Sequence, residues 1–236
     1  MNNLQQPQKQ VSHLDGSLEV HSIFFTIQGE GPFTGQRAVF IRLAGCNLQC
    51  PLCDTDYTSN VCRMNPEQII NDVFKLLVEN CNADGDMPLI VITGGEPFRQ
   101  NIAPLVNELA QNGFHTQIET NGTLYQELPF EAVTVVCSPK TGSINKNLAP
   151  HITALKYVVT AGKVSEEDGL PLSALDHPAS PILARPPEGF GGYVFIQPAD
   201  EKDEQKNQLN TSAAVQSVLS FGYVLQLQVH KLIGVE

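Results

Sequence analysis

The fold is decided by residues 38–53, which read AVFIRLAGCNLQCPLC. A largely apolar run with the length of a buried strand leads into Cys46, Cys50 and Cys53, spaced CxxxCxxC. Three thiolates on one loop favour zinc, copper(I) or an iron–sulfur cluster. A structural zinc site needs a fourth Cys or His, and the nearest candidate, Cys62, fits none of the usual spacings. The motif therefore predicts a 4Fe-4S cluster with one iron open to a further ligand.

Composition narrows the class of protein. The 236 residues carry a net charge of -11, and 42% of them are hydrophobic. This length and apolar content favour a single domain that spans residues 1–236, with residues 1–16 as a flexible arm. The acidic balance and the lack of a basic run argue against a nucleic-acid partner. With no bilayer-spanning apolar stretch and no N-terminal signal pattern, we expect a cytoplasmic protein without membrane contact. Disulfides suit small secreted chains, whereas half of these six cysteines share one loop.

Apolar runs that read as strands alternate with helical patterns along the chain. Strands are predicted at 20–27, 38–43, 89–92, 116–119, 133–137, 155–159 and 193–196, and helices at 66–80, 102–112 and within 202–221. This alternation predicts a parallel sheet buried on both faces. A full eight-unit barrel takes about 250 residues, so we expect a partial, open (βα)6 TIM-like barrel with N- and C-terminal extensions. The rival, a doubly wound Rossmann sheet, lacks a G-x-G-x-x-G after its first strand.

Other stretches place the ends of these elements. Asn65 and Gln68 have the spacing of a capping box at a helix start. The segment 165–192, rich in Pro, Gly and Ala, is expected to be a long loop or insertion. Residues 223–229 alternate in polarity like a strand and lead to His230. Polar or glycine-rich residues follow nearly every predicted strand, and in a parallel barrel those ends meet at the rim that holds the active site.

Some single residues allow two interpretations. Gln28, Gly29 and Glu30 follow a strand and form either a substrate contact or a plain turn. Arg42, inside an apolar run, either pairs with a structural carboxylate or binds a ligand carboxylate in bidentate fashion. His230 is either a strand-end histidine bonded to backbone or a site residue.

Three motifs in order carry a family resemblance. The CxxxCxxC loop, 94–97 (GGEP) and 119–122 (ETNG) resemble the signature set of radical S-adenosylmethionine (SAM) enzymes. Leu52 stands where such motifs commonly carry an aromatic residue. More narrowly, the segments 26–31 (TIQGEG), 34–35 (TG), 40–43 (FIRL), 53–55 (CDT), 138–140 (SPK) and 229–231 (VHK) resemble the 7-carboxy-7-deazaguanine synthase family. That resemblance covers nearly the whole chain.

The resemblance implies a radical SAM carbon–nitrogen lyase. The implied reaction contracts the ring of 6-carboxy-5,6,7,8-tetrahydropterin to 7-carboxy-7-deazaguanine with loss of ammonia, a step toward queuosine and related 7-deazapurines. Cys46, Cys50 and Cys53 would hold the 4Fe-4S cluster, whose open iron chelates SAM. Reduction then yields a 5′-deoxyadenosyl radical that abstracts a substrate hydrogen. No catalytic side chain of the protein is assigned, because the radical comes from SAM.

The resemblance also implies binding residues and partners. Thr55 matches the family's protein ligand to Mg2+. The SAM contacts implied are Gly94, Gly95, Glu96, Glu119, Asn121, Ser138, Pro139 and Lys140. The substrate contacts implied are Ile27, Gln28, Gly29, Glu30, Arg42, Thr93, Gln197, His230 and the terminal Glu236. An external electron donor such as flavodoxin or ferredoxin and a second copy in a homodimer are the expected protein partners.

Two rival functions share part of this pattern. A glycyl-radical-enzyme activase would have the same cluster and the Gly-Gly-Glu-Pro strand end, but it would act on a protein. The Gln-Gly-Glu-Gly segment, with Arg42 and His230, better suits a small polar anion. A non-catalytic electron-transfer or metal-binding protein is the rival from another class, and it predicts no cleavage of SAM.

Overall fold

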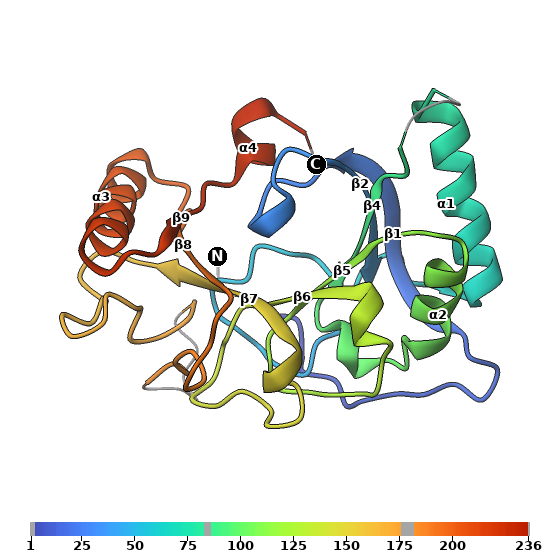
Figure 1. Cartoon of the computed structure of the whole chain (residues 1–236), viewed down its shortest axis with the longest axis horizontal. Coiled ribbons are helices and arrows are strands. Elements are labelled where there is room, and N and C mark those ends of the chain that lie inside the picture. The colour runs from blue at the N-terminus through green and yellow to red at the C-terminus, as the bar shows by residue number, and fades with distance from the viewer. Residues whose placement is uncertain (1–2, 83–85, 176–181, 236) are drawn as a thin grey trace.

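The computed structural model describes residues 3–82, 86–175 and 182–235. Its strands are β1 (Leu18–Ile27), β2 (Arg37–Leu43), β3 (Cys62–Met64), β4 (Leu89–Gly94), β5 (Thr116–Thr120), β6 (Val133–Cys137), β7 (Ile152–Val159), β8 (Tyr193–Pro198) and β9 (Val224–Leu225). They form one curved sheet in the order β3-β1-β2-β4-β5-β6-β7-β8-β9 (Figure 1). Because the order of the parallel strands, from β2 and β4 onward to β9, never reverses, the doubly wound Rossmann alternative is excluded.

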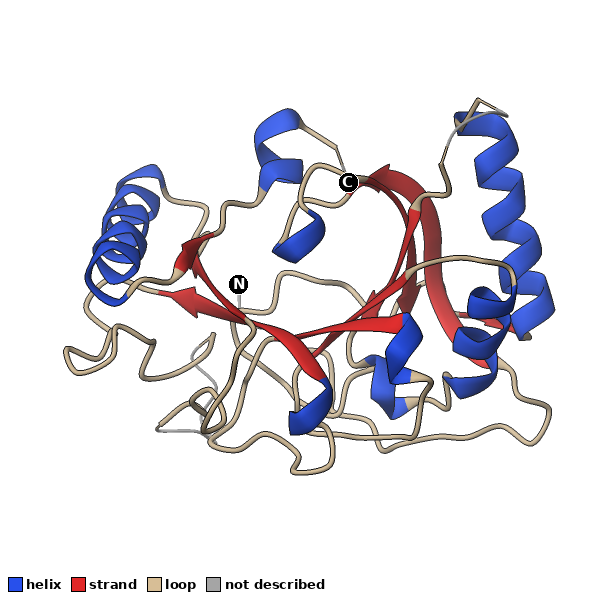
Figure 2. Cartoon of the chain, in the orientation of Figure 1, coloured by secondary structure: helices blue, strands red, loops and turns tan. Residues whose placement is uncertain are grey.

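The expected parallel core is confirmed. From β2 through β9 all neighbouring strands pair in parallel, while β1 and β3 add an antiparallel extension. The sheet curls without closing, since β3 and β9 form its two edges (Figure 2). This is the partial, open barrel with extensions at both ends of the chain.

Helices are fewer than a regular βα repeat requires. The α-helices are α1 (Pro66–Asn80), α2 (Ala103–Gln111), α3 (Glu204–Phe221) and α4 (Val229–Ile233), and the 3-10 helices are η1 (Gly31–Phe33), η2 (Pro97–Arg99), η3 (Phe130–Ala132) and η4 (Ala149–His151). The predicted capping box of Asn65 and Gln68 starts α1. In the described chain, the β5–β6 and β6–β7 connections contain only 3-10 turns, and the β6–β7 stretch is rich in Gly, Pro and Asn.

The segment 165–192 compensates for one missing helix. Leu170, Ala174 and Leu183 from its described part join the main hydrophobic core beside Tyr157 of β7. The Tyr157 hydroxyl also donates to the Ala184 carbonyl at 2.8 Å. The insertion therefore packs on β7 with side chains that a helix would otherwise supply.

The described residues near both termini lie against the barrel. The described part of the expected arm, residues 3–16, contacts the cysteine loop, where Gln8 N donates to Cys46 O at 2.7 Å and Asn3 N to Pro51 O at 2.8 Å. At the other end only 224–225 continue the sheet, and the chain then turns into α4. The expectation of His230 at a strand end is therefore wrong, since that residue lies in α4.

The faces of the sheet differ in character. Successive strand residues point to opposite sides, and the outer set, which includes Ile41, Ile92, Ile118 and Leu155, is fully buried in the main core with α1 and α2. We call the other side the inner face, and its residues are Phe40, Arg42, Val91, Thr93, Gln117, Glu119, Val136, Ala154, Lys156, Phe195 and Gln197. The fold thus gathers six polar or charged strand residues on one concave face: Arg42, Thr93, Gln117, Glu119, Lys156 and Gln197.

Candidate active site

The cysteine loop leaves β2 and packs tightly against the end of β4. Glu96 N donates to Gly45 O at 3.0 Å, and Gly95 N donates to Leu43 O at 3.3 Å. A Cβ on Gly95 would collide with the Gly45 carbonyl and with Cys46, so this contact requires glycine. Two of the predicted SAM motifs therefore meet at the same rim.

The three thiols are suited to a cluster. Burial raises the pKa of Cys46 to about 12 and that of Cys50 to about 11, and it also raises the pKa of Cys53. Thiolates are therefore formed here only when a metal replaces the protons. In the described residues, no three His, Cys, Asp or Glu side chains are placed to share one metal ion. The cysteines of an iron–sulfur cluster bind separate irons and need not meet at one point.

Glu96 joins two strand ends beneath this loop. Its fully buried carboxylate accepts hydrogen bonds from Asn121 N at 2.7 Å, Thr120 Oγ1 at 2.8 Å and Phe98 N at 3.0 Å. Burial raises the pKa of Glu96 to about 7 despite these donors. Asn121 in turn donates to Asn47 Oδ1 in the cysteine loop at 2.9 Å. Glu96 and Asn121, both expected to contact SAM, thus fix the rim on which SAM would rest.

The 138–140 segment follows β6 on the same rim. Ser138 N donates to Thr120 O at 2.8 Å, and Lys140 Nζ donates to Ser138 O at 3.0 Å. Burial lowers the pKa of Lys140, while a thiolate at Cys50 would favour the ammonium form of Lys140. A lysine therefore stands close enough to the cysteine loop to interact with it electrostatically.

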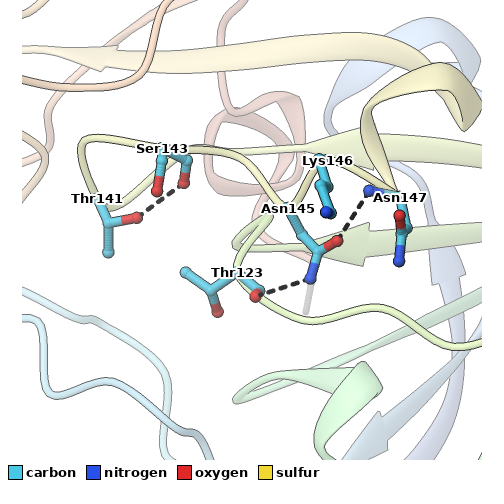
Figure 3. Close-up of a pocket in the computed structure, with 6 residues that line it drawn as sticks. All are labelled: Thr123, Thr141, Ser143, Asn145, Lys146 and Asn147. Atoms are coloured by element: carbon cyan, nitrogen blue, oxygen red, sulfur yellow. Dashed lines mark hydrogen bonds between the residues drawn. The ribbon is translucent and has the colours of Figure 1, made fainter.

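A polar pocket of about 340 Å³ lies beyond these strand ends, and sequence reasoning did not single it out. It is lined by Thr123, Thr141, Ser143, Asn145, Lys146 and Asn147 (Figure 3). Thr123 connects it to the rim, because Asn47 Nδ2 donates to Thr123 Oγ1 at 2.8 Å.

Glu119 is the centre of the inner face. It accepts hydrogen bonds from Gln28 Nε2 at 3.1 Å, Gln117 Nε2 at 3.0 Å and Thr93 Oγ1 at 3.3 Å. The sequence assigned Glu119 to SAM, whereas its contacts lie with Gln28 and Thr93, both assigned to substrate. Gln117 was missed, although a glutamine alternating with Glu119 in a short β-rich run points to the same face.

The loop after β1 carries a buried ion pair. Lys156 Nζ, from β7, pairs with Glu30 Oε2, and Gln228 Nε2 donates to Glu30 Oε1 at 2.8 Å. Burial disfavours the Glu30 carboxylate, but Lys156 and Gln228 outweigh that cost and hold the pKa of Glu30 below its usual range. Lys156 was also missed, although a lysine inside the apolar run ITALKYVV is a visible signal.

The C-terminal segment docks on the same loop. Gly31 N donates to Gln226 Oε1 at 2.7 Å, and Val229 N donates to Gly29 O at 3.2 Å. A Cβ on Gly29 would collide with the His230 ring. The structure therefore brings His230 against the segment that includes Ile27, Gln28, Gly29 and Glu30, as expected for one site.

The remaining predicted residues are placed as follows. Arg42 lies on the inner face with its guanidinium carbon 5.2 Å from the centre of the Phe24 ring. Gln197 is 5% exposed, and its Oε1 has no hydrogen-bond partner among the described residues. Thr55 directly follows Asp54, which pairs with Lys231 of α4. Glu236 lies outside the described residues.

Comparison with known proteins agrees with this arrangement. Residues 27–140 match a family model described as a 4Fe-4S single cluster domain. The chain is 42% identical to the 7-carboxy-7-deazaguanine synthase of Rhodospirillum rubrum, covering 93% of both chains. It is also 42% identical to that of Rickettsia prowazekii, over 98% of this chain and 94% of the relative. A crystal structure of QueE from Escherichia coli shares the fold, with a TM-score of 0.65 and 22% identity over 90% of this chain and 94% of that one.

The open barrel with its rim cysteine loop and cluster-domain match defines a radical SAM enzyme that uses a 4Fe-4S cluster and SAM. Within that class, the chain belongs to the 7-carboxy-7-deazaguanine synthase family, and it is a lyase. This membership decides against the glycyl-radical-enzyme activase and the non-catalytic electron-transfer protein. Among the described residues, none of the helices is both long and apolar enough to cross a bilayer.

Proposed function

We propose that the chain converts 6-carboxy-5,6,7,8-tetrahydropterin to 7-carboxy-7-deazaguanine with loss of ammonia. The observation that carries this proposal is the inner face, where Gln28, Thr93 and Glu119 form one polar network. The Oε1 atoms of Gln117 and Gln197 are buried there without a partner among the described residues. Buried acceptors of this kind are costly unless a ligand supplies donors, and a pterin ring carries several N–H groups.

The residues divide into two sets by position. At the rim, Cys46, Cys50 and Cys53 would hold the cluster, and the Gly94–Gly95 backbone and Ser138–Lys140 would border SAM. When bound, the cluster and SAM supply the radical chemistry, and the barrel supplies orientation and exclusion of water. On the inner face, Arg42 would bind the substrate carboxylate in bidentate fashion, while Gln28, Thr93, Glu119 and Gln197 would hold the ring.

The metal, the partners and the compartment are further parts of the proposal. The Thr55 hydroxyl, with substrate oxygens and waters, would complete a Mg2+ shell, since this ion usually keeps several waters. Reduction of the cluster requires an external electron donor of the flavodoxin or ferredoxin class. A homodimer and a cytoplasmic location are proposed as well, and the six free cysteines suit a reducing compartment.

The test is anaerobic reconstitution with iron and sulfide, followed by SAM, dithionite, Mg2+ and the carboxy-tetrahydropterin. We expect SAM to be cleaved, which is detected as 5′-deoxyadenosine or as methionine. We also expect a deazapurine with a new absorbance, and a lower yield of that deazapurine when Mg2+ is omitted. Cys50→Ala should abolish both products. Cleavage of SAM without a deazapurine would contradict the proposed substrate and leave radical SAM chemistry standing.

A further inference from the structure

The ion pair of Lys156 and Glu30 lies inside the barrel, away from the solvent-exposed surface. The side chain of Lys156 is 14% exposed and that of Glu30 is 12% exposed. A buried pair of this kind contributes little net stability compared with apolar residues of the same volume, because both charges lose their hydration. Stability alone is therefore a weak reason for a lysine in the apolar strand β7.

The pair is the end of a continuous polar chain. Glu30 N donates to Gln28 Oε1 at 3.0 Å, and Gln28 Nε2 donates to Glu119 Oε1 at 3.1 Å. Glu119 Oε2 accepts from Thr93 Oγ1 at 3.3 Å. A displacement of Glu30 would therefore be passed through one side chain, Gln28, to the carboxylate at the centre of the inner face.

Other charges surround the pair from several elements. His230 of α4 acts electrostatically on Glu30. Glu119 of β5 and Asp54 of the cysteine loop favour the ammonium form of Lys156, and Lys140 lies close enough to Lys156 for repulsion. Lys156 is thus the cation between two carboxylates, Glu30 and Glu119, that the proposed substrate would meet.

We propose that Lys156 is a positioning residue for the pterin, because it anchors Glu30 and thereby sets Gln28 and Glu119 in the arrangement that binds the ring. This inference rests on the proposed function. It assigns Lys156 no contact with the reacting atoms, so its effect should appear in substrate affinity and in the pH dependence of that affinity.

The test measures the dissociation constant of 6-carboxy-5,6,7,8-tetrahydropterin by calorimetry on cluster-loaded, SAM-bound protein without reductant, so that no turnover occurs. We expect Lys156→Met to weaken binding by about ten- to a hundredfold at mildly alkaline pH, as for a lost charge-assisted hydrogen bond. Lys156→Arg keeps the charge and should stay within a few-fold of the wild type. Lys75→Met, which breaks the exposed Lys75–Asp72 pair on α1, is the matched control and should bind normally.

The pH profile separates positioning from mere folding. Without the lysine, burial would raise the pKa of Glu30, so the Lys156→Met variant should bind best at acidic pH and lose affinity as Glu30 ionises. Removing that carboxylate as well, in Glu30→Gln/Lys156→Met, should make the difference from the wild type independent of pH. The wild-type profile is the baseline for every variant.

The double variant removes both charges of the pair, and it carries the test if Lys156→Met does not fold. The inference is overturned if the folded Lys156→Met protein, or otherwise the double variant, binds the pterin as tightly as the wild type at every pH. If the wild type itself does not bind the pterin, the proposed function fails first, and the two failures are thereby distinguished.

Discussion

The inner and outer faces of the sheet are built by the same strands but follow different rules. Ile118 of β5 points outward and is fully buried in the main core, whereas its neighbour Glu119 points inward and accepts three hydrogen bonds. On the outer face, shape and volume decide what fits. On the inner face, donors and acceptors decide it, so the comparison separates residues that hold the fold from those available to a ligand.

The inner face is also the less satisfied of the two. Gln117 and Gln197 each bury a carbonyl oxygen that lacks a hydrogen bond in the described chain. Leaving such an acceptor unpaired costs about 1–3 kcal/mol. The outer face carries no comparable cost at Ile41, Ile92 or Leu155, which are apolar and fully buried. The protein therefore tolerates a cost in stability on the side where binding can recover it.

Among substitutions on the two faces, the largest effect is expected at Glu119 on the inner face. Glu119→Gln keeps the size but removes the charge and one acceptor oxygen from a network with three donors. We expect kcat/KM for the pterin to fall by about a hundredfold or more, with a melting temperature close to that of the wild type. Steady-state assays and thermal unfolding check both halves. Near-normal kcat/KM would remove Glu119 from the proposed substrate site.

The neighbouring residue should show the opposite behaviour. Ile118→Ala deletes buried methyl and methylene groups from the main core, so we expect a loss of about 2–5 kcal/mol in the free energy of unfolding. The folded fraction should keep kcat/KM within a few-fold of the wild type. Urea unfolding and assays well below the midpoint test this. A large loss of kcat/KM in fully folded protein would show that the two faces are not independent.

The sequence predicted the rim better than the inner face. Cysteine spacing, Gly94–Gly95 and 138–140 are local patterns, and a parallel barrel necessarily gathers strand ends at one rim. The apolar runs that alternate with helical patterns also predicted the strands of the parallel core. The connections between the strands were less predictable. Whether such a connection forms a helix depends on which other segments of the chain can cover the sheet. Leu170, Ala174 and Leu183 of the insertion took that role at β7.

The inner-face contacts depend on residues distant in sequence. Lys156 meets Glu30 across 126 positions, and Gln228 meets Glu30 across 198. No local pattern encodes such a pair. The alternation in residues 223–229 was similarly misleading, because Gln226 and Gln228 bond to the 29–31 loop and draw the chain out of the sheet before His230.

The smallest expected effect concerns two buried carboxylates with opposite pKa shifts. The pKa of Glu96 is raised to about 7 from the usual 4.5 because burial outweighs its three hydrogen bonds, whereas the pKa of Glu30 is lowered. The folded protein therefore holds a proton on Glu96 that the unfolded chain releases. The stability that this proton confers is present below about pH 4.5 and is lost as the pH rises to about 7, by up to about 3 kcal/mol.

Glu96→Gln removes this titration but keeps one acceptor oxygen for Thr120 and Phe98. We expect its melting temperature, relative to that of the wild type, to rise as the pH is raised through that interval and to level off above it. Thermal unfolding under anaerobic conditions across the range measures the difference. Glu30→Gln is the contrasting control, because the stabilising ionisation of Glu30 is lost only as the pH falls below its usual pKa, and its difference from the wild type should stay flat over the same interval. A constant difference for Glu96→Gln would mean that its three donors keep Glu96 ionised, and the end of β4 would then carry a permanent negative charge beside the cysteine loop.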